Sequence, residues 1–257
     1  MKNKELAREY DKIYKQGAYT HFFTFNSFHH SKLIIDMVER WEGKKVLEIG
    51  CGEGRLCSLI SFAGAKKCEG IDYSHEAIKI AQNTYHISNV SFSCKNYKEV
   101  QKRYDVVVLD GLLEHLDKPF EELKYLIENR LTVNGVVIAA LPSFLNPRGY
   151  VWMTLSKLFG VPMSLTDLHY LCPFDFEEFC LENNYNLSIK SARQDWGAGE
   201  DTIYDFNTRL RKALKDANLD NSNVDDLLVW LRKAVRYFET SIYTGAIVVY
   251  KIEKEKK

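Results

Sequence analysis

The stretch KKVLEIGCGEG, residues 44–54, decides the fold. Its first half is short and apolar, as expected of a strand buried inside a parallel sheet. Three glycines follow at every second position, and such a turn lets a ligand approach the backbone closely. Leucine and isoleucine recur at helical spacing after Gly54, which predicts that a helix begins there. A strand, a glycine-rich turn and a helix N-terminus together form a nucleotide-binding crevice.

An acid follows this turn at the spacing expected of a ribose ligand. Asp72 closes a second apolar run, and a carboxylate about 20 residues beyond such a turn binds ribose hydroxyls in dinucleotide-binding folds. The dinucleotide pattern G-x-G-x-x-G is incomplete here, because Arg55 stands at its last glycine. The pattern present is E-x-G-x-G-x-G, which begins at Glu48.

This pattern resembles the first motif of class I S-adenosylmethionine-dependent methyltransferases. The segment YDVVVLDGLLEHLDKP, residues 104–119, resembles a second family segment, and HYLCPFDFEEF, residues 169–179, resembles the entry to the family's last main helix. The resemblance covers about residues 44–192 and the terminal strand. It implies an α/β fold with a doubly wound, Rossmann-like sheet of seven strands in the order 3-2-1-4-5-7-6. The last strand would be antiparallel.

The resemblance also implies where S-adenosylmethionine binds. Asn96 stands where the family usually has an aspartate, and its amide oxygen accepts the same hydrogen bond from adenine. Tyr73 and Tyr97 are candidates for enclosing the adenine, although ordinary surface aromatics explain them equally well. The implied cofactor residues in this part of the chain are Glu48, Gly50, Cys51, Gly52, Gly54, Asp72, Tyr73, Asn96, Tyr97 and Asp110.

Two histidines are the candidate bases for removing a proton from the methyl acceptor. His115 follows the fourth strand, predicted over residues 104–110, and His169 precedes the last main helix. Imidazole titrates near neutral pH. A structural role explains His115 equally well and His169 better. Some relatives bind magnesium through E-x-x-E-H, but Gly111 replaces the first acid, so we expect no metal. His21, His29 and His30 suggest a metal only faintly, because His29 and His30 are neighbours that point about 100° apart on a helix.

Helical segments surround the predicted sheet. We expect an N-terminal helical cap over residues 1–43, in which Tyr14 or Tyr19 contacts the cofactor or packs against the domain. Residues 44–257 would form the methyltransferase domain, with helical insertions near 143–170 and 195–243. The first insertion suits a lid over the acceptor, a dimer face or a membrane-surface contact. The second suits a further cap that bears on substrate choice.

Composition limits the partners. Lys plus Arg and Asp plus Glu both number 35, so bulk charge gives no case for nucleic acid. The aromatic and apolar insertions favour a small, partly apolar acceptor, and a homodimer stays open. Apolar runs are too short to cross a membrane, and the six cysteines lack a zinc-like spacing, which favours a reducing cytoplasm.

The sequence therefore predicts methyl transfer from S-adenosylmethionine to an oxygen or nitrogen of a small molecule. Two alternatives remain. An NAD-dependent reductase agrees with Asp72 but not with Arg55. A non-catalytic S-adenosylmethionine-binding partner subunit would keep the same fold and the same glycine turn.

Overall fold

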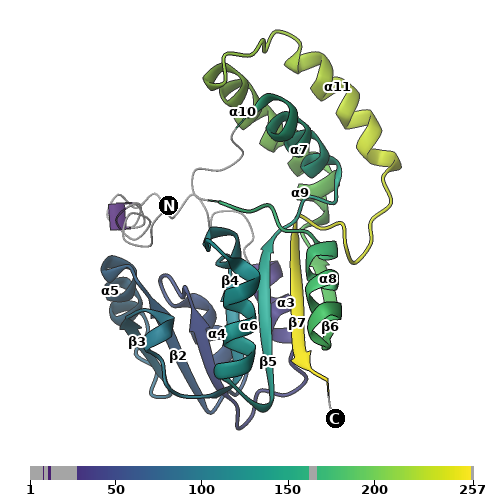
Figure 1. The fold of residues 1–257 in the computed structure, drawn as a ribbon. Helices are drawn as coiled ribbons and strands as arrows, with labels where there is room; N and C mark the ends of the chain where they lie inside the picture. The colour runs from purple at the N-terminus through teal and green to yellow at the C-terminus, as the bar shows by residue number, and fades with distance from the viewer. Residues whose placement is uncertain (1–7, 9–10, 13–27, 162–166, 256–257) are drawn as a thin grey trace.

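The computed structural model describes residues 8, 11–12, 28–161 and 167–255. A seven-stranded sheet in the order β3-β2-β1-β4-β5-β7-β6 lies at its centre (Figure 1). Only β7 runs antiparallel to its neighbours, β5 and β6. The predicted doubly wound sheet with an antiparallel last strand is confirmed. The strands are β1 (Lys45–Ile49), β2 (Lys67–Asp72), β3 (Val90–Cys94), β4 (Tyr104–Asp110), β5 (Leu131–Pro142), β6 (Tyr185–Ala192) and β7 (Ile247–Lys254).

Helices pack on both faces of the sheet, because its central strands are apolar on both sides. Alternate residues of β4 show this: Val107 and Leu109 belong to one buried cluster, and Val106 and Val108 to the other. Helices α6 and α8 cover the first face, and α3, α4 and α5 cover the second (Figure 1). Their bounds are α3 (Phe28–Asp36), α4 (Arg55–Phe62), α5 (His75–Thr84), α6 (Pro119–Asn129) and α8 (Pro173–Asn183).

A group of helices, here called the cap, stands beyond the carboxyl ends of the parallel strands (Figure 1). It comprises α7 (Pro147–Phe159), α9 (Gln194–Ala198), α10 (Glu200–Asp216), α11 (Val224–Ala234) and the 3-10 turn η3 (Val235–Tyr237). The cap has its own apolar cluster, separate from the two clusters on the sheet. This cluster includes Trp152, Phe206 and Leu228. The two predicted insertions thus pack on each other and share a core.

Both insertions are tied together at the place where they leave the sheet. The amide of Asn146, at the start of α7, donates to the carbonyls of Ser143 at 3.2 Å and Gly245 at 3.3 Å. Its oxygen accepts the N–H of Gly149 at 2.8 Å and so caps α7. In the part of the chain that the structure describes, no helix combines the length and apolar character needed to cross a bilayer.

Candidate active site

The glycine turn joins β1 to α4 at the carboxyl edge of the sheet. Gly50, Gly52 and Gly54 have φ values of 76°, 51° and 84°, in the left-handed region that favours glycine. The N–H groups of Gly50 and Cys51 both donate to the carbonyl of Ile71, at 2.8 and 3.0 Å. These bonds fix the turn against β2. The backbone conformation therefore explains why glycine recurs here, as the sequence predicted.

Asp72 ends β2 directly beside this turn. Its Oδ2 accepts the N–H of Gly52 at 3.0 Å and its Oδ1 accepts the N–H of Ser74 at 2.8 Å. Burial raises the pKa of Asp72, and these backbone hydrogen bonds counteract that rise. Each carboxylate oxygen keeps a further lone pair. Asp72 can therefore shape the turn and still accept hydrogen bonds from a ribose.

Two more carboxyl groups lie almost fully buried near the crevice. Glu48 is 3% exposed and Glu114, in the 3-10 turn η2 (Leu113–His115), is 4% exposed. Burial is the largest cause that raises the pKa of each to about 8, and the charge of Asp110 adds to both shifts. The Oε2 atom of each has no hydrogen-bond partner among the residues that the structure describes.

Asp110 ends β4 and meets a residue that the sequence analysis did not assign to the cofactor site. Nε2 of His30, from α3, lies 3.1 Å from Oδ2 of Asp110, with 17% and 25% of the two side chains exposed. His30 Nδ1 is buried without a hydrogen-bond partner in the described part of the chain. The adjacent histidines were the only sequence signal, and a long-range partner such as Asp110 leaves no local pattern.

The candidate adenine residues have other contacts as well. Asn96 caps the 3-10 turn η1 (Tyr97–Glu99): its side-chain oxygen accepts the N–H of Lys98 at 2.9 Å. Burial, with the nearby Glu122 carboxylate on α6 as the next cause, raises the Tyr97 pKa. Tyr73 is half-buried. Their adenine contacts stay predictions, and the contact of Tyr97 with a buried apolar cluster on the sheet favours a packing role for it.

The two candidate bases differ in their surroundings. His115 has a side chain only 10% exposed, and its Nδ1 lies 3.4 Å from Oδ1 of Asp167. His169 lies further out, with Nε2 3.3 Å from the backbone carbonyl of Asp117. Asp167 was not selected from the sequence, because no recognised motif includes it. Among the described residues, no group of His, Cys, Asp and Glu could hold a metal ion.

Two residues predicted to contact the cofactor from the N-terminal cap, Tyr14 and Tyr19, lie outside the described residues. Among the described residues near the N-terminus, Asp11 lies close to Asp72, the candidate ribose ligand. Ser74, the N-cap of α5, donates its hydroxyl to Oδ1 of Asp11 at 2.5 Å. The charge of Asp11 contributes to the raised pKa of Asp72.

The side chains around the turn fit a cationic ligand. Glu48, Asp72, Asp110 and Glu114 all come from the carboxyl edge of β1, β2 or β4 or from the turn after β4. With Glu48 and Glu114 protonated at neutral pH, the negative charge here comes from Asp72 and Asp110. The negatively charged pyrophosphate of a dinucleotide would face these like charges, whereas a sulfonium and an ammonium would face opposite ones. The residues present therefore fit S-adenosylmethionine.

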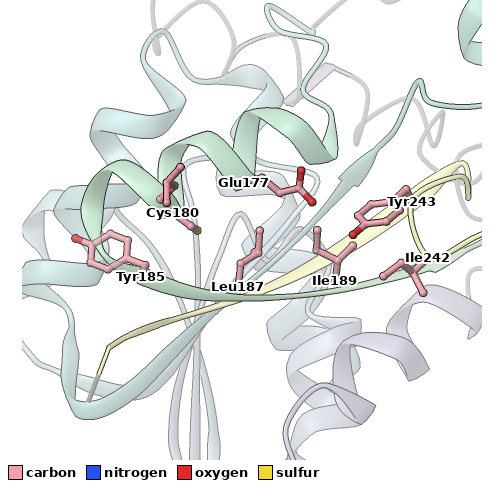
Figure 2. Close-up of a pocket in the computed structure, with 8 residues that line it drawn as sticks. Glu177, Cys180, Tyr185, Leu187, Ile189, Ile242 and Tyr243 are labelled. Atoms are coloured by element: carbon pink, nitrogen blue, oxygen red, sulfur yellow. The ribbon is translucent and has the colours of Figure 1, made fainter. Parts of the chain in front are cut away.

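Two apolar pockets of about 370 Å³ each lie elsewhere. One runs along the sheet edge, where Cys180 of α8 faces Leu187 and Ile189 of β6, with Ile242 and Tyr243 closing one end (Figure 2). The other lies in the cap between α7, α10 and α11. Neither is lined by the glycine turn, Asp72 or Asp110, so neither marks the cofactor site.

Comparison with known proteins agrees with this geometry. Residues 28–187 match the model of a methyltransferase domain family. The chain belongs to this family, that of the class I S-adenosylmethionine-dependent methyltransferases, and S-adenosylmethionine is its cofactor.

Individual relatives are similar over shorter stretches. A malonyl-[acyl-carrier protein] O-methyltransferase of Bacillus cereus is 26% identical over 97 residues, 37% of this chain and 36% of that protein. A mitochondrial ubiquinone biosynthesis O-methyltransferase of Saccharomyces cerevisiae is 30% identical over 86 residues, 31% of this chain and 28% of that protein. The chain thus spans about a third of the length of these relatives.

One solved structure shares the fold over nearly the whole chain. It is a chain in the complex of the Trm112 methyltransferase activator of Haloferax volcanii with a methyltransferase. The TM-score is 0.62 and the identity 14%, over 96% of this chain and 98% of that one. This likeness concerns the fold.

Proposed function

We propose that the protein transfers a methyl group from S-adenosylmethionine to a hydroxyl of a small, partly apolar acceptor. The glycine turn with the Asp72 carboxylate beside it carries the proposal, and membership of the methyltransferase family supports it. The two curated relatives named above are O-methyltransferases, which favours oxygen as the nucleophile. When bound, the cofactor supplies the electrophilic methyl group, so the chain itself must align the acceptor and remove its proton.

We propose that His115 is the base that removes the proton from the acceptor hydroxyl. The backbone N–H groups of Leu168 and His169 both donate to the carbonyl of Glu114, at 2.8 and 3.1 Å, so the segment that carries Asp167 is fixed against η2. The Asp167 carboxylate, with Oδ1 3.4 Å from Nδ1 of His115, orients the imidazole ring. Nε2 is then the atom that accepts the proton. His169 is the weaker candidate, because its Nε2 already faces a backbone carbonyl.

The cap supplies a place for the rest of the acceptor. It stands beyond the same edge of the sheet that carries the glycine turn and Asp110 (Figure 1). Its helices are rich in apolar side chains, which suits an acceptor with an apolar part. The acids at the turn disfavour the first alternative, a reductase that binds NAD. No observation favours the second, a non-catalytic partner subunit.

Two measurements test the proposal. Titration calorimetry should show binding of S-adenosylmethionine and far weaker binding of NAD. With radiolabelled cofactor and a panel of phenolic and acyl-chain hydroxyl compounds, His115→Gln should lower the methylation rate by about 10²–10⁴-fold and leave cofactor affinity unchanged. His86→Gln, an exposed histidine on another surface, is the matched control. Tighter binding of NAD, or full activity in both His115→Gln and His169→Gln, contradicts the proposal.

A further inference from the structure

The outer side of the last cap helix carries an unusual combination of residues. Val229, Trp230, Lys233, Arg236 and Tyr237 recur at helical spacing on α11 and η3, and we call them the aromatic–basic face. Val229 is 55% exposed, Trp230 63% and Tyr237 89%, and both cationic side chains are exposed. Helix α11 forms the outer edge of the cap (Figure 1).

The core of the cap does not explain this face. The opposite side of the same segment is already buried there, through Leu228, Leu231 and Val235. The outer side of such a surface helix ordinarily carries polar residues. Here it carries a tryptophan and a tyrosine, and Trp230 is the most exposed of the four tryptophans in the chain.

Basic side chains lie in the middle of this segment, and acidic ones lie only at its ends. Residues 227–238 contain three cations and no carboxylate. Arg232 pairs with Glu200 at 3.2 Å, whereas Lys233 and Arg236 have no ion pair among the described residues. The nearest acids in the sequence, Asp226 and Glu239, flank the segment at its two ends. The middle of the face therefore presents positive charge between aromatic rings.

We propose that the aromatic–basic face docks the protein on the surface of an anionic lipid bilayer. Trp and Tyr side chains settle at the headgroup level, and Lys and Arg reach the phosphates beside them. A protein partner suits the face less well. The face consists of five residues along about 12 Å of helix, whereas a stable protein interface takes about 20–30 residues from each partner.

Vesicle co-sedimentation tests this docking without any methyl transfer, so its outcome is independent of the proposed function. The full-length protein should sediment with vesicles of phosphatidylcholine mixed with phosphatidylglycerol and much less with phosphatidylcholine alone. Binding should weaken as salt is added, because salt screens the attraction. Trp230 emission should shift to the blue on binding, and Trp230→Phe should abolish that shift while keeping most of the affinity.

Paired variants separate the face from nonspecific attraction. Lys233→Glu with Arg236→Glu should lower the vesicle partition coefficient by at least about 25-fold, since each cation near an anionic surface contributes about fivefold. Trp230→Ala with Tyr237→Ala should also lower it at least about tenfold. The controls make the same changes at exposed residues elsewhere: Lys66→Glu with Lys67→Glu, and Phe62→Ala, which is 77% exposed on α4.

Circular dichroism should give the same melting temperature for all these variants, since every substituted side chain is exposed. The proposal is overturned if the wild type ignores anionic vesicles at low salt, or if the face variants bind as well as their controls. Binding to an acidic carrier protein without binding to vesicles would also overturn it and assign the face to a protein partner.

Discussion

The Asp72 carboxylate has a local and a ligand-directed role. It accepts the N–H groups of Gly52 and Ser74, and the family resemblance assigns it to the ribose hydroxyls. Asp72→Ala should therefore weaken S-adenosylmethionine binding at least tenfold, because hydrogen bonds to a charged acceptor contribute about 1.5–3 kcal/mol each. Titration calorimetry measures this. Asp72→Asn keeps one acceptor oxygen and should lose less affinity; an unchanged dissociation constant in folded Asp72→Ala would place the ribose elsewhere.

Glu48 should make stability depend on pH. Its pKa rises from 4.5 in the ordinary case to about 8 through burial, so the folded state holds a proton that the unfolded state has released. The stabilisation is complete below pH 4.5 and is lost as pH rises through about 8. Across this window the protein should lose up to about 1.4 kcal/mol per pH unit through Glu48.

Urea unfolding of the ligand-free protein at several pH values checks this expectation. Glu48→Gln should give a flatter curve than the wild type, because the amide carries no titrating proton. Glu178→Gln, at an exposed position, is the control and should leave the slope unchanged. Identical slopes for the wild type and Glu48→Gln would mean that Glu48 is ionised in the folded protein.

Single residues were predictable from the sequence where a local pattern constrained them. The three glycines of the turn have the positive φ values that their spacing indicated, and Asp72 lies beside them. His30 and Asp167 were missed for a common reason. Their partners, Asp110 and His115, are 80 and 52 positions away, and such pairs appear only once the chain has folded.

Within the cap, two elements distant in sequence share one buried carboxylate. Asp205 of α10 has a side chain 1% exposed, and it accepts Nε of Arg148 at 2.9 Å and a guanidinium N–H of Arg209 at 3.0 Å. The indole N–H of Trp152 donates to the same carboxylate at 3.2 Å. This network joins α7 to α10 and so holds the two insertions together.

Asp205→Ala should destabilise the cap by about 3–5 kcal/mol, because it leaves the buried Arg148 without its counter-charge. Chemical denaturation followed by tryptophan fluorescence measures this loss. Asp225→Ala is the matched control: it removes an exposed ion pair with Arg211, which contributes at most about 1 kcal/mol. Equal effects of the two substitutions would show that the network does not hold the cap.

Strands and helices were predictable to different degrees. The pattern at residues 104–110 gave β4 with its observed bounds, because a strand buried on both faces is a continuous apolar run. Within the helical insertion expected near residues 195–243, the last α-helix, α11, ends at Ala234 and is followed by η3. Apolar spacing continues past that point, but Phe238 is already extended. The apolar periodicity of the sequence alone therefore does not show where this helix ends.

The whole molecule has separate apolar cores for the sheet and for the cap. Two clusters lie on the faces of the sheet, and a third lies within the cap. The strand order followed from the family resemblance, whereas the union of the two insertions had no sequence signal. A homodimer, a cytoplasmic location and the division into an N-terminal cap and a methyltransferase domain stay predictions.

Separate cores predict that the cofactor stabilises one part of the molecule selectively. A ligand stabilises by about 2.7 kcal/mol when its concentration is 100 times its dissociation constant, and only where unfolding destroys its site. The crevice is formed by β1, β2 and β4, so saturating S-adenosylmethionine should slow amide hydrogen exchange in these strands and in the glycine turn. Amides of α10 and α11 should exchange by local opening of the cap, at a rate that the cofactor leaves unchanged. Exchange measured by mass spectrometry decides between two arrangements: equal protection of the cap would mean that the cap and the sheet open as one unit.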